Sequence, residues 1–81
     1  MEFKQLQSFV AAVQHKSFTK AAEHLFLSQP TISAHIRQLE EELGKRLILR
    51  TTKSIEVTPL GQEVYEYALR ILTLRDRISQ V

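Results

Sequence analysis

Two helix starts separated by a short turn constrain this chain more than any other feature. Ser17 and Ser28 each stand directly before a segment with helical character, and serine is a preferred N-cap because its hydroxyl accepts a backbone N–H of the first turn. Pro30 falls in the first turn of the second segment, where its missing N–H costs nothing. Ala21 and Ala22, in the middle of the first segment, are small enough for two helices to cross closely. The sequence therefore predicts two helices joined by a tight turn, a helix-turn-helix.

The second of these helices is amphipathic. Its apolar residues fall on one side at 100° per residue: Ile32, Ile36, Leu39 and Leu43. His35 lies nearer that side, so we expect it to pack rather than to contact a base. The other side begins with hydroxyls, an amide and small residues, which suit phosphates and base edges when a helix start enters the major groove. That side carries Pro30, Ala34, Arg37 and Glu41, and it is flanked by Thr31, Ser33 and Gln38.

The same helix turns acidic toward its end, at Glu40, Glu41 and Glu42. Phosphates would repel these carboxylates, and we expect all three to surround a solvated helix end. Only the stretch from Ser28 to about Gln38 is therefore predicted to face DNA. Gly44 ends the helix as a C-cap.

Positive charge is concentrated after this helix. Residues 45–58 carry a net charge of +3, whereas the whole chain carries +2. Within them, 47–51 and 54–58 are short runs rich in branched residues, which predict a two-stranded hairpin that turns at Thr52–Lys53. A basic hairpin directly after a recognition helix is a wing. Arg50 and Lys53, at or near its tip, would reach phosphates or a narrow minor groove.

The remaining segments predict two more helices. Residues 1–16 have an apolar stripe of helical period, typical of a helix that closes the core. Thr58 and Pro59 start the last helix, whose seam repeats every seven residues. Its apolar band is wider than one partner needs, so part is expected to cover the wing and core and part to meet a second chain. A helix packed only on its own domain would explain 60–68 but not 71–81. The predicted dimerisation residues are Val64, Tyr67, Ile71, Leu74, Ile78 and Val81.

Other classes of protein are disfavoured. The chain has no cysteine, and its three histidines are spaced by nine and eleven residues, so neither a disulfide nor a zinc site is predicted. No apolar run could span a bilayer and no signal pattern opens the chain, so we expect a cytoplasmic, nucleoid-associated protein. Its serines are caps or lie on an exposed face, and no Gly-rich phosphate loop exists, so an enzyme is not expected.

The motif SFTKAAEHLFLSQPTISAHIRQLEEELGKRLILRT, followed by VTPLGQ, resembles the DNA-binding domain of LysR-type transcriptional regulators, and the resemblance covers the whole chain. It implies a bacterial, mainly α, winged helix-turn-helix with three helices and a two-stranded wing, followed by a long linker helix that pairs antiparallel in a dimer. It also implies a tetramer in the full-length protein. A small-molecule effector would bind a C-terminal domain that is absent here, and no cofactor is expected within these residues.

The resemblance also implies which residues contact double-stranded DNA: Gln29, Pro30, Thr31, Ser33 and Arg37 on the recognition helix, and Arg50 and Lys53 on the wing. One departure affects base preference. The family commonly has a basic residue at Ala34 and often Gln at His35. Alanine can touch a thymine methyl but cannot hydrogen-bond, so no guanine contact is carried over to this position.

These observations predict a DNA-binding domain over 1–58, with the helix-turn-helix at about 18–37 and the wing at about 46–58. A linker helix over 59–81 would dimerise it on a near-palindromic site. The linker ends in mid-seam, which suggests a piece of a longer protein. The alternative is a winged-helix protein-interaction module without specific DNA binding, in which Glu40–Glu42 would meet a basic protein surface.

Overall fold

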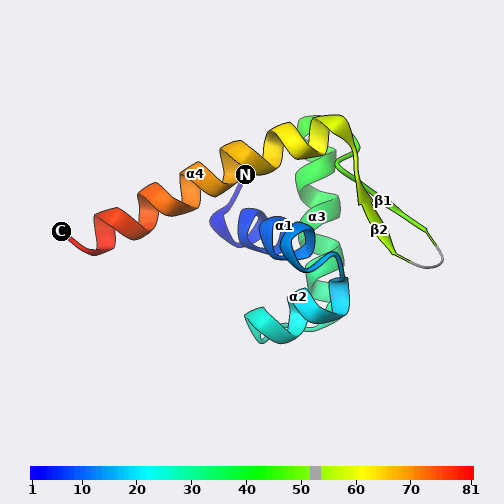
Figure 1. Ribbon diagram of the computed structural model, residues 1–81, viewed down its shortest axis with the longest axis horizontal. Helices are drawn as coiled ribbons and strands as arrows, with labels where there is room; N and C mark the ends of the chain where they lie inside the picture. Colours follow the sequence, from blue (N-terminus) through cyan, green and yellow to red (C-terminus); the bar gives the residue numbers. More distant parts are fainter. Residues whose placement is uncertain (52–53) are drawn as a thin grey trace.

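A computed structural model describes residues 1–51 and 54–81 (Figure 1). The fold is the mainly α winged helix-turn-helix that the sequence predicts. Its extents are 44 × 26 × 18 Å, and the wing and the C-terminal end of the last helix lie at opposite ends of the long axis. The elements in order are α1 (Phe3–His15), α2 (Phe18–Leu25), α3 (Gln29–Leu43), β1 (Ile48–Arg50), β2 (Ile55–Val57) and α4 (Pro59–Ser79).

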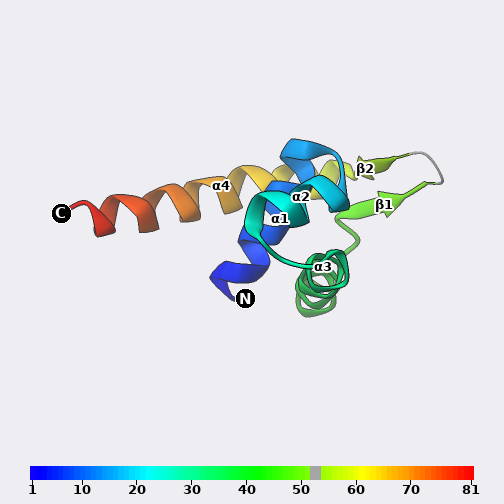
Figure 2. The ribbon, with the colours of Figure 1, turned by 90° about the horizontal axis from the view of Figure 1, so that it is seen from below.

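The core lies where α1, α2 and α3 pack together, and the start of the wing and part of α4 close it. Phe9, Ile32, Leu39 and Leu47 are fully buried. The two small residues of α2, Ala21 and Ala22, are buried where α2 packs against its neighbours, as predicted. In Figure 2 α3 is seen nearly end-on, below α1 and α2 in the view, so one side of α3 faces these two helices and the other faces away from them.

The predicted helix caps are confirmed. Ser17 Oγ accepts from the backbone N of Lys20 at 3.1 Å, and Ser28 Oγ accepts from that of Thr31 at 3.2 Å. Thr58 Oγ1 accepts from the N of Gly61 at 2.9 Å. Gly44 ends α3 with a φ of 66°, in the left-handed region that glycine tolerates best.

Two helices end at left-handed residues that the sequence did not reveal. α1 is followed by Lys16 with a φ of 52°, and α2 by Phe26 with a φ of 57°. After α2 the backbone N–H of Phe26 bonds the Glu23 carbonyl, and that of Leu27 bonds the Ala22 carbonyl. These bonds make the tight turn between α2 and α3 without a glycine.

The strands pair antiparallel, with Ile48 opposite Val57 and Arg50 opposite Ile55.

One of the three glutamates at the end of α3 is not placed as the sequence predicts. Glu40 does not lie at a solvated helix end; its Oε2 accepts the backbone N–H groups of Leu47 at 2.7 Å and Ile48 at 3.2 Å. These amides begin the wing and would otherwise be unpaired. A carboxylate on α3 therefore anchors β1.

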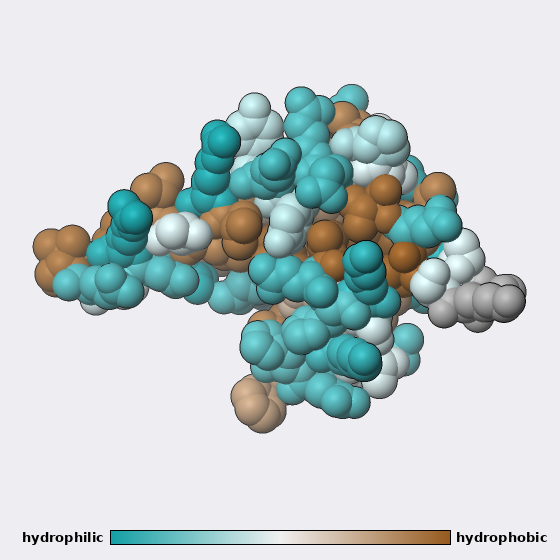
Figure 3. Space-filling model, viewed as in Figure 1, coloured by the Kyte–Doolittle hydropathy of each residue, from teal (hydrophilic) through white to brown (hydrophobic). Residues whose placement is uncertain are grey.

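The apolar band of α4 divides differently from the sequence prediction. Two of the predicted dimerisation residues, Val64 and Ile71, pack against the chain's own core together with Leu72, although the sequence placed Ile71 beyond the domain. Contact with the domain continues to Arg75, whose guanidinium lies 5.0 Å from the centroid of the Phe3 ring. The exposed apolar residues are Tyr67, Leu69, Leu74, Ile78 and Val81. In Figure 3 hydrophobic residues recur along α4 to its C-terminal end at the left.

Candidate nucleic-acid interface

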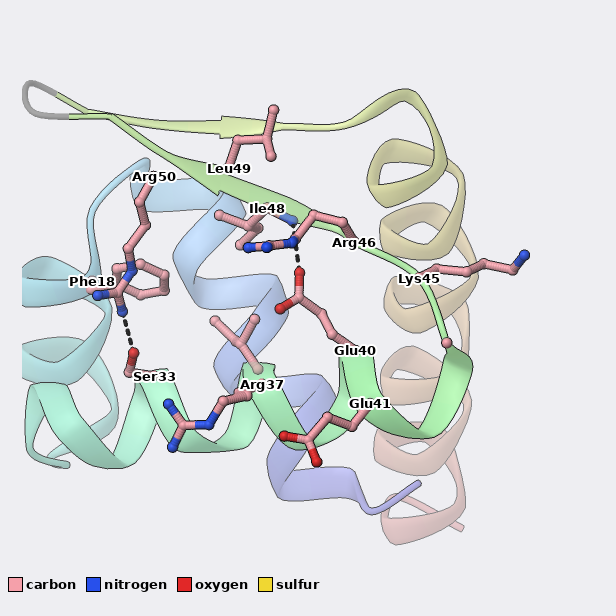
Figure 4. A pocket seen from close by; sticks show the side chains of 12 residues that line it. Phe18, Ser33, Arg37, Glu40, Glu41, Lys45, Arg46, Ile48, Leu49 and Arg50 are labelled. Atoms are coloured by element: carbon pink, nitrogen blue, oxygen red, sulfur yellow. Dashed lines mark hydrogen bonds between the residues drawn. The ribbon is translucent and has the colours of Figure 1, made fainter.

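An open groove of about 650 Å³ lies between α3 and β1 (Figure 4). Four cationic residues line it: Arg37 on α3, Lys45 and Arg46 on the connection, and Arg50 on β1. The side chain of Lys45 points away from the groove in Figure 4. Among the residues that the structure describes, none of these four forms an ion pair with a carboxylate. Their charge is therefore available to a polyanion.

The carboxylates of the same groove matter less than their number suggests. Oε2 of Glu40 is held by two backbone amides, as described above. Glu42 lies elsewhere and pairs with the N-terminal ammonium at 2.6 Å. Glu41 is the exposed carboxylate of the groove, on the C-terminal half of α3. Both carboxylates that line the groove, Glu40 and Glu41, therefore lie toward its end nearest Gly44, away from the start of α3.

The start of α3 presents most of the predicted contact residues. Gln29 and Pro30 are exposed in its first turn, and Arg37 is exposed two turns further along. Thr31 is half-buried, and its Oγ1 lies 2.8 Å from the Ser28 hydroxyl, so it also belongs to the helix cap. Lys53 falls outside the described residues.

Arg50 and Ser33 meet across the groove. The Arg50 guanidinium lies over the Phe18 ring, with Cζ 4.0 Å from the ring centroid, and Nη2 donates to Ser33 Oγ (Figure 4). The side chain therefore reaches back from β1 to α2 and α3. The sequence named Arg50 and Ser33 separately. It missed Phe18, because an aromatic residue at the first position of a helix reads only as core.

Two polar contacts hold the inner side of α3 to α1. Ser8, which is fully buried, lies with its Oγ 2.7 Å from Nδ1 of His35. One turn further along α3, Gln5 Nε2 donates to Oε1 of Gln38 at 3.2 Å. His35 is therefore a packed residue, as predicted. Both contacts fix the rotation of α3 about its axis, which decides which side chains face outward.

Other kinds of site find no support in the described residues. No group of three or more His, Cys, Asp or Glu side chains gathers where a metal could bind within 1–51 and 54–81. In the same ranges, none of the helices combines the length and the apolar character that a bilayer-spanning segment needs.

A family model described as "Bacterial regulatory helix-turn-helix protein, lysR family" matches residues 3–62. The transcriptional regulator BenM of Acinetobacter baylyi is 44% identical over 78 residues, which are 96% of this chain and 26% of BenM. CitR of Bacillus subtilis is 47% identical over 72 residues, 89% of this chain and 25% of CitR. The chain thus spans about a quarter of these relatives.

Solved structures match over nearly the whole chain. The DNA-binding domain of BenM in complex with catB site 1 DNA superposes with a TM-score of 0.94 at 42% identity, covering 99% of this chain and 90% of that one. The DNA-binding domain of CbnR in complex with DNA gives a TM-score of 0.94 at 39% identity, covering 99% and 92%.

Proposed function

This chain belongs to the lysR family of bacterial regulatory helix-turn-helix proteins, and from that premise we propose that it binds double-stranded DNA sequence-specifically. The observation that carries the proposal is the groove beside α3, lined by three arginines, Arg37, Arg46 and Arg50, that no carboxylate among the described residues pairs with. Its flank is the start of α3, whose outward residues are small or polar. The BenM and CbnR domains, which share this fold, are known in complexes with DNA.

The side chains divide into two roles. Gln29 and Thr31 at the start of α3, with Arg37 further along, would read base edges in the major groove. Ser33 and Arg50 would hold phosphates, with Lys53 of the wing and the free N–H groups of the α3 terminus. Pro30 has no N–H to donate, so its contact would be apolar. Phosphate contacts fix register, and base contacts supply sequence preference.

The functional unit is proposed to be a homodimer. Tyr67, Leu74 and Ile78 form an exposed apolar series at spacings of seven and four residues on α4, which a second α4 could cover. Two-fold pairing would present two α3 helices to a near-palindromic site. Transcriptional regulation, a tetramer and a small-molecule effector bound outside residues 1–81 are proposals for the full-length protein.

Selection of bound duplexes from a random pool, followed by a salt series on the selected site, tests this function. We expect one enriched near-palindromic sequence and a linear fall of log affinity with log salt concentration. Gln29→Ala should change the selected sequence. Lys53→Ala should weaken all sites alike and lower the salt slope by about one per contact.

Arg77→Ala is the matched control, because it removes an exposed cation at the far end of α4 and should change neither property. A chain that enriches no sequence and binds random duplex no more tightly than a neutral protein would refute the proposal. It would favour a protein-interaction module instead.

A further inference from the structure

We propose that Phe18 is a positioning residue for DNA binding: its ring holds the Arg50 guanidinium beside Ser33, so that both side chains grip one phosphate. The inference rests on the proposed function and deepens it. It assigns a role to a residue that is itself 7% exposed and too deep to contact DNA directly.

The first step concerns the arginine. The Phe18 ring covers one face of the guanidinium at 4.0 Å, and Ser33 engages Nη2. A guanidinium has five N–H donors, so most remain available for an acceptor. Arg50 itself is exposed, and no carboxylate among the described residues pairs with it. The stack therefore restricts an exposed, flexible cation to one place without neutralising it.

The second step concerns the serine hydroxyl. Ser33 Oγ accepts from Arg50, so the hydroxyl keeps its own hydrogen to donate. A helical serine or threonine can give that hydrogen to the carbonyl four residues earlier, as Thr73 does to Leu69 and Ser79 does to Arg75. Ser33 has no such bond among the described residues. Its hydrogen is therefore left for an acceptor outside the chain.

The third step concerns charge. Phe18 is the first residue of α2, so the guanidinium stacks at the positive end of that helix. A cation at this end is disfavoured unless an anion joins it. The site thus brings together cationic N–H groups, a free hydroxyl hydrogen and a helix N-terminus. No carboxylate of the described residues pairs with the cation there. A DNA phosphate supplies the missing charge and accepts from both side chains.

A double-mutant cycle separates positioning from support of the fold. Wild type, Phe18→Leu, Arg50→Ala and the double variant are titrated with the selected duplex, after circular dichroism has shown that each is folded. Phe18→Leu should weaken binding about three- to fivefold per half-site in the wild type, the size of one cation–π contact. In the Arg50→Ala background the same change should alter affinity by less than about 1.5-fold, because its partner is gone.

Phe3→Leu is the matched control, because it removes a ring beneath another arginine, Arg75, away from the groove. Any effect that it has should be the same with and without Arg50. If Phe18→Leu does not fold, Phe18→Met replaces it in the cycle, because methionine fills a similar volume without a ring, and the same dependence on Arg50 is expected.

A measurement without DNA tests the stack itself. The side-chain protons of Arg50 should be shifted upfield by the Phe18 ring current in the free protein, and Phe18→Leu should abolish the shift. Equal weakening by Phe18→Leu in both backgrounds would overturn the inference, since the ring would then only support the fold. Tighter binding by Phe18→Leu would also overturn it, since the stack would then withhold Arg50. A ring-current shift in a wild-type chain that binds no duplex would refute the proposed function while leaving the stack intact.

Discussion

At the scale of single residues, Phe26 combines two unfavourable features. Its ring is 95% exposed, and its backbone has a positive φ of 57°. A left-handed backbone costs an L residue about 1–2 kcal/mol, whereas glycine adopts it freely. The residue thus ends α2 at an energetic cost that no contact of its side chain offsets among the described residues.

Phe26→Gly is therefore expected to stabilise the fold, by about 1 kcal/mol. For a domain of this size that corresponds to a rise in melting temperature of about 4–8 °C. Thermal unfolding by circular dichroism measures it. Phe26→Ala removes the ring but keeps the strain, and should change the melting temperature little. A stabilisation by alanine equal to that by glycine would assign the cost to the exposed ring instead.

Gly61 is required for a different reason. A Cβ there would overlap the carbonyl oxygen of Leu47 and lie 2.9 Å from its carbonyl carbon. The first turn of α4 would have to move away, which would break the bond from Thr58 Oγ1 to the Arg46 carbonyl. We expect Gly61→Ala to cost on the order of 3 kcal/mol. Denaturant unfolding measures the loss.

Gly44→Ala is the comparison for Gly61→Ala. Gly44 has a φ of 66°, and apart from its neighbours along the chain no described residue lies within 4 Å of the place that an alanine Cβ would take there. Only backbone strain of about 1 kcal/mol is therefore expected. Similar losses at both glycines would mean that α4 can shift without penalty.

At the scale of elements, the wing depends on a carboxylate of α3. Glu40→Ala would leave the amides of Leu47 and Ile48 without their acceptor, and an unpaired buried polar group costs about 1–3 kcal/mol. We expect that loss in stability, together with faster hydrogen exchange of these two amides. Glu41→Ala, an exposed change next to it, should stay within about 0.5 kcal/mol. Unchanged exchange at Leu47 and Ile48 would contradict the anchoring role.

The same elements show what the sequence could predict. Caps were readable because Ser17, Ser28 and Thr58 act on N–H groups three residues away. The anchor from Glu40 was not, because its partners lie beyond Gly44 and depend on the path of the connection. The stack of Arg50 on Phe18 joins residues 32 positions apart, which no local pattern encodes. The division of α4 was misjudged because heptad spacing does not say how far the chain's own domain reaches.

At the scale of the whole molecule, the position of a substitution along α4 decides what it tests. Leu74 is 60% exposed, so Leu74→Lys should abolish dimerisation and leave the fold intact. Ile71 packs against the core, so Ile71→Lys should also unfold the domain. Sedimentation velocity with circular dichroism separates the two. Dimers that survive Leu74→Lys at micromolar concentration would exclude this face as the interface.

The length of α4 makes it a lever. Its 21 residues extend about 31 Å, so a rotation of about 10° at its base would move its far end by about 5 Å, more than one base-pair step of about 3.4 Å. Two contacts between α4 and the rest of the domain oppose such a rotation. One is the close fit of Gly61 against Leu47, and the other is the contact of the Arg75 guanidinium with the Phe3 ring.

These two contacts, at Gly61 and Arg75, are about 21 Å apart along the helix axis. A displacement of about 0.5 Å at Arg75 then corresponds to a rotation of α4 by about 1.4°, which moves its far end by less than about 1 Å. A torque applied to the far end of α4 would therefore turn the whole domain, α3 included, as one body, rather than be absorbed where the helix begins.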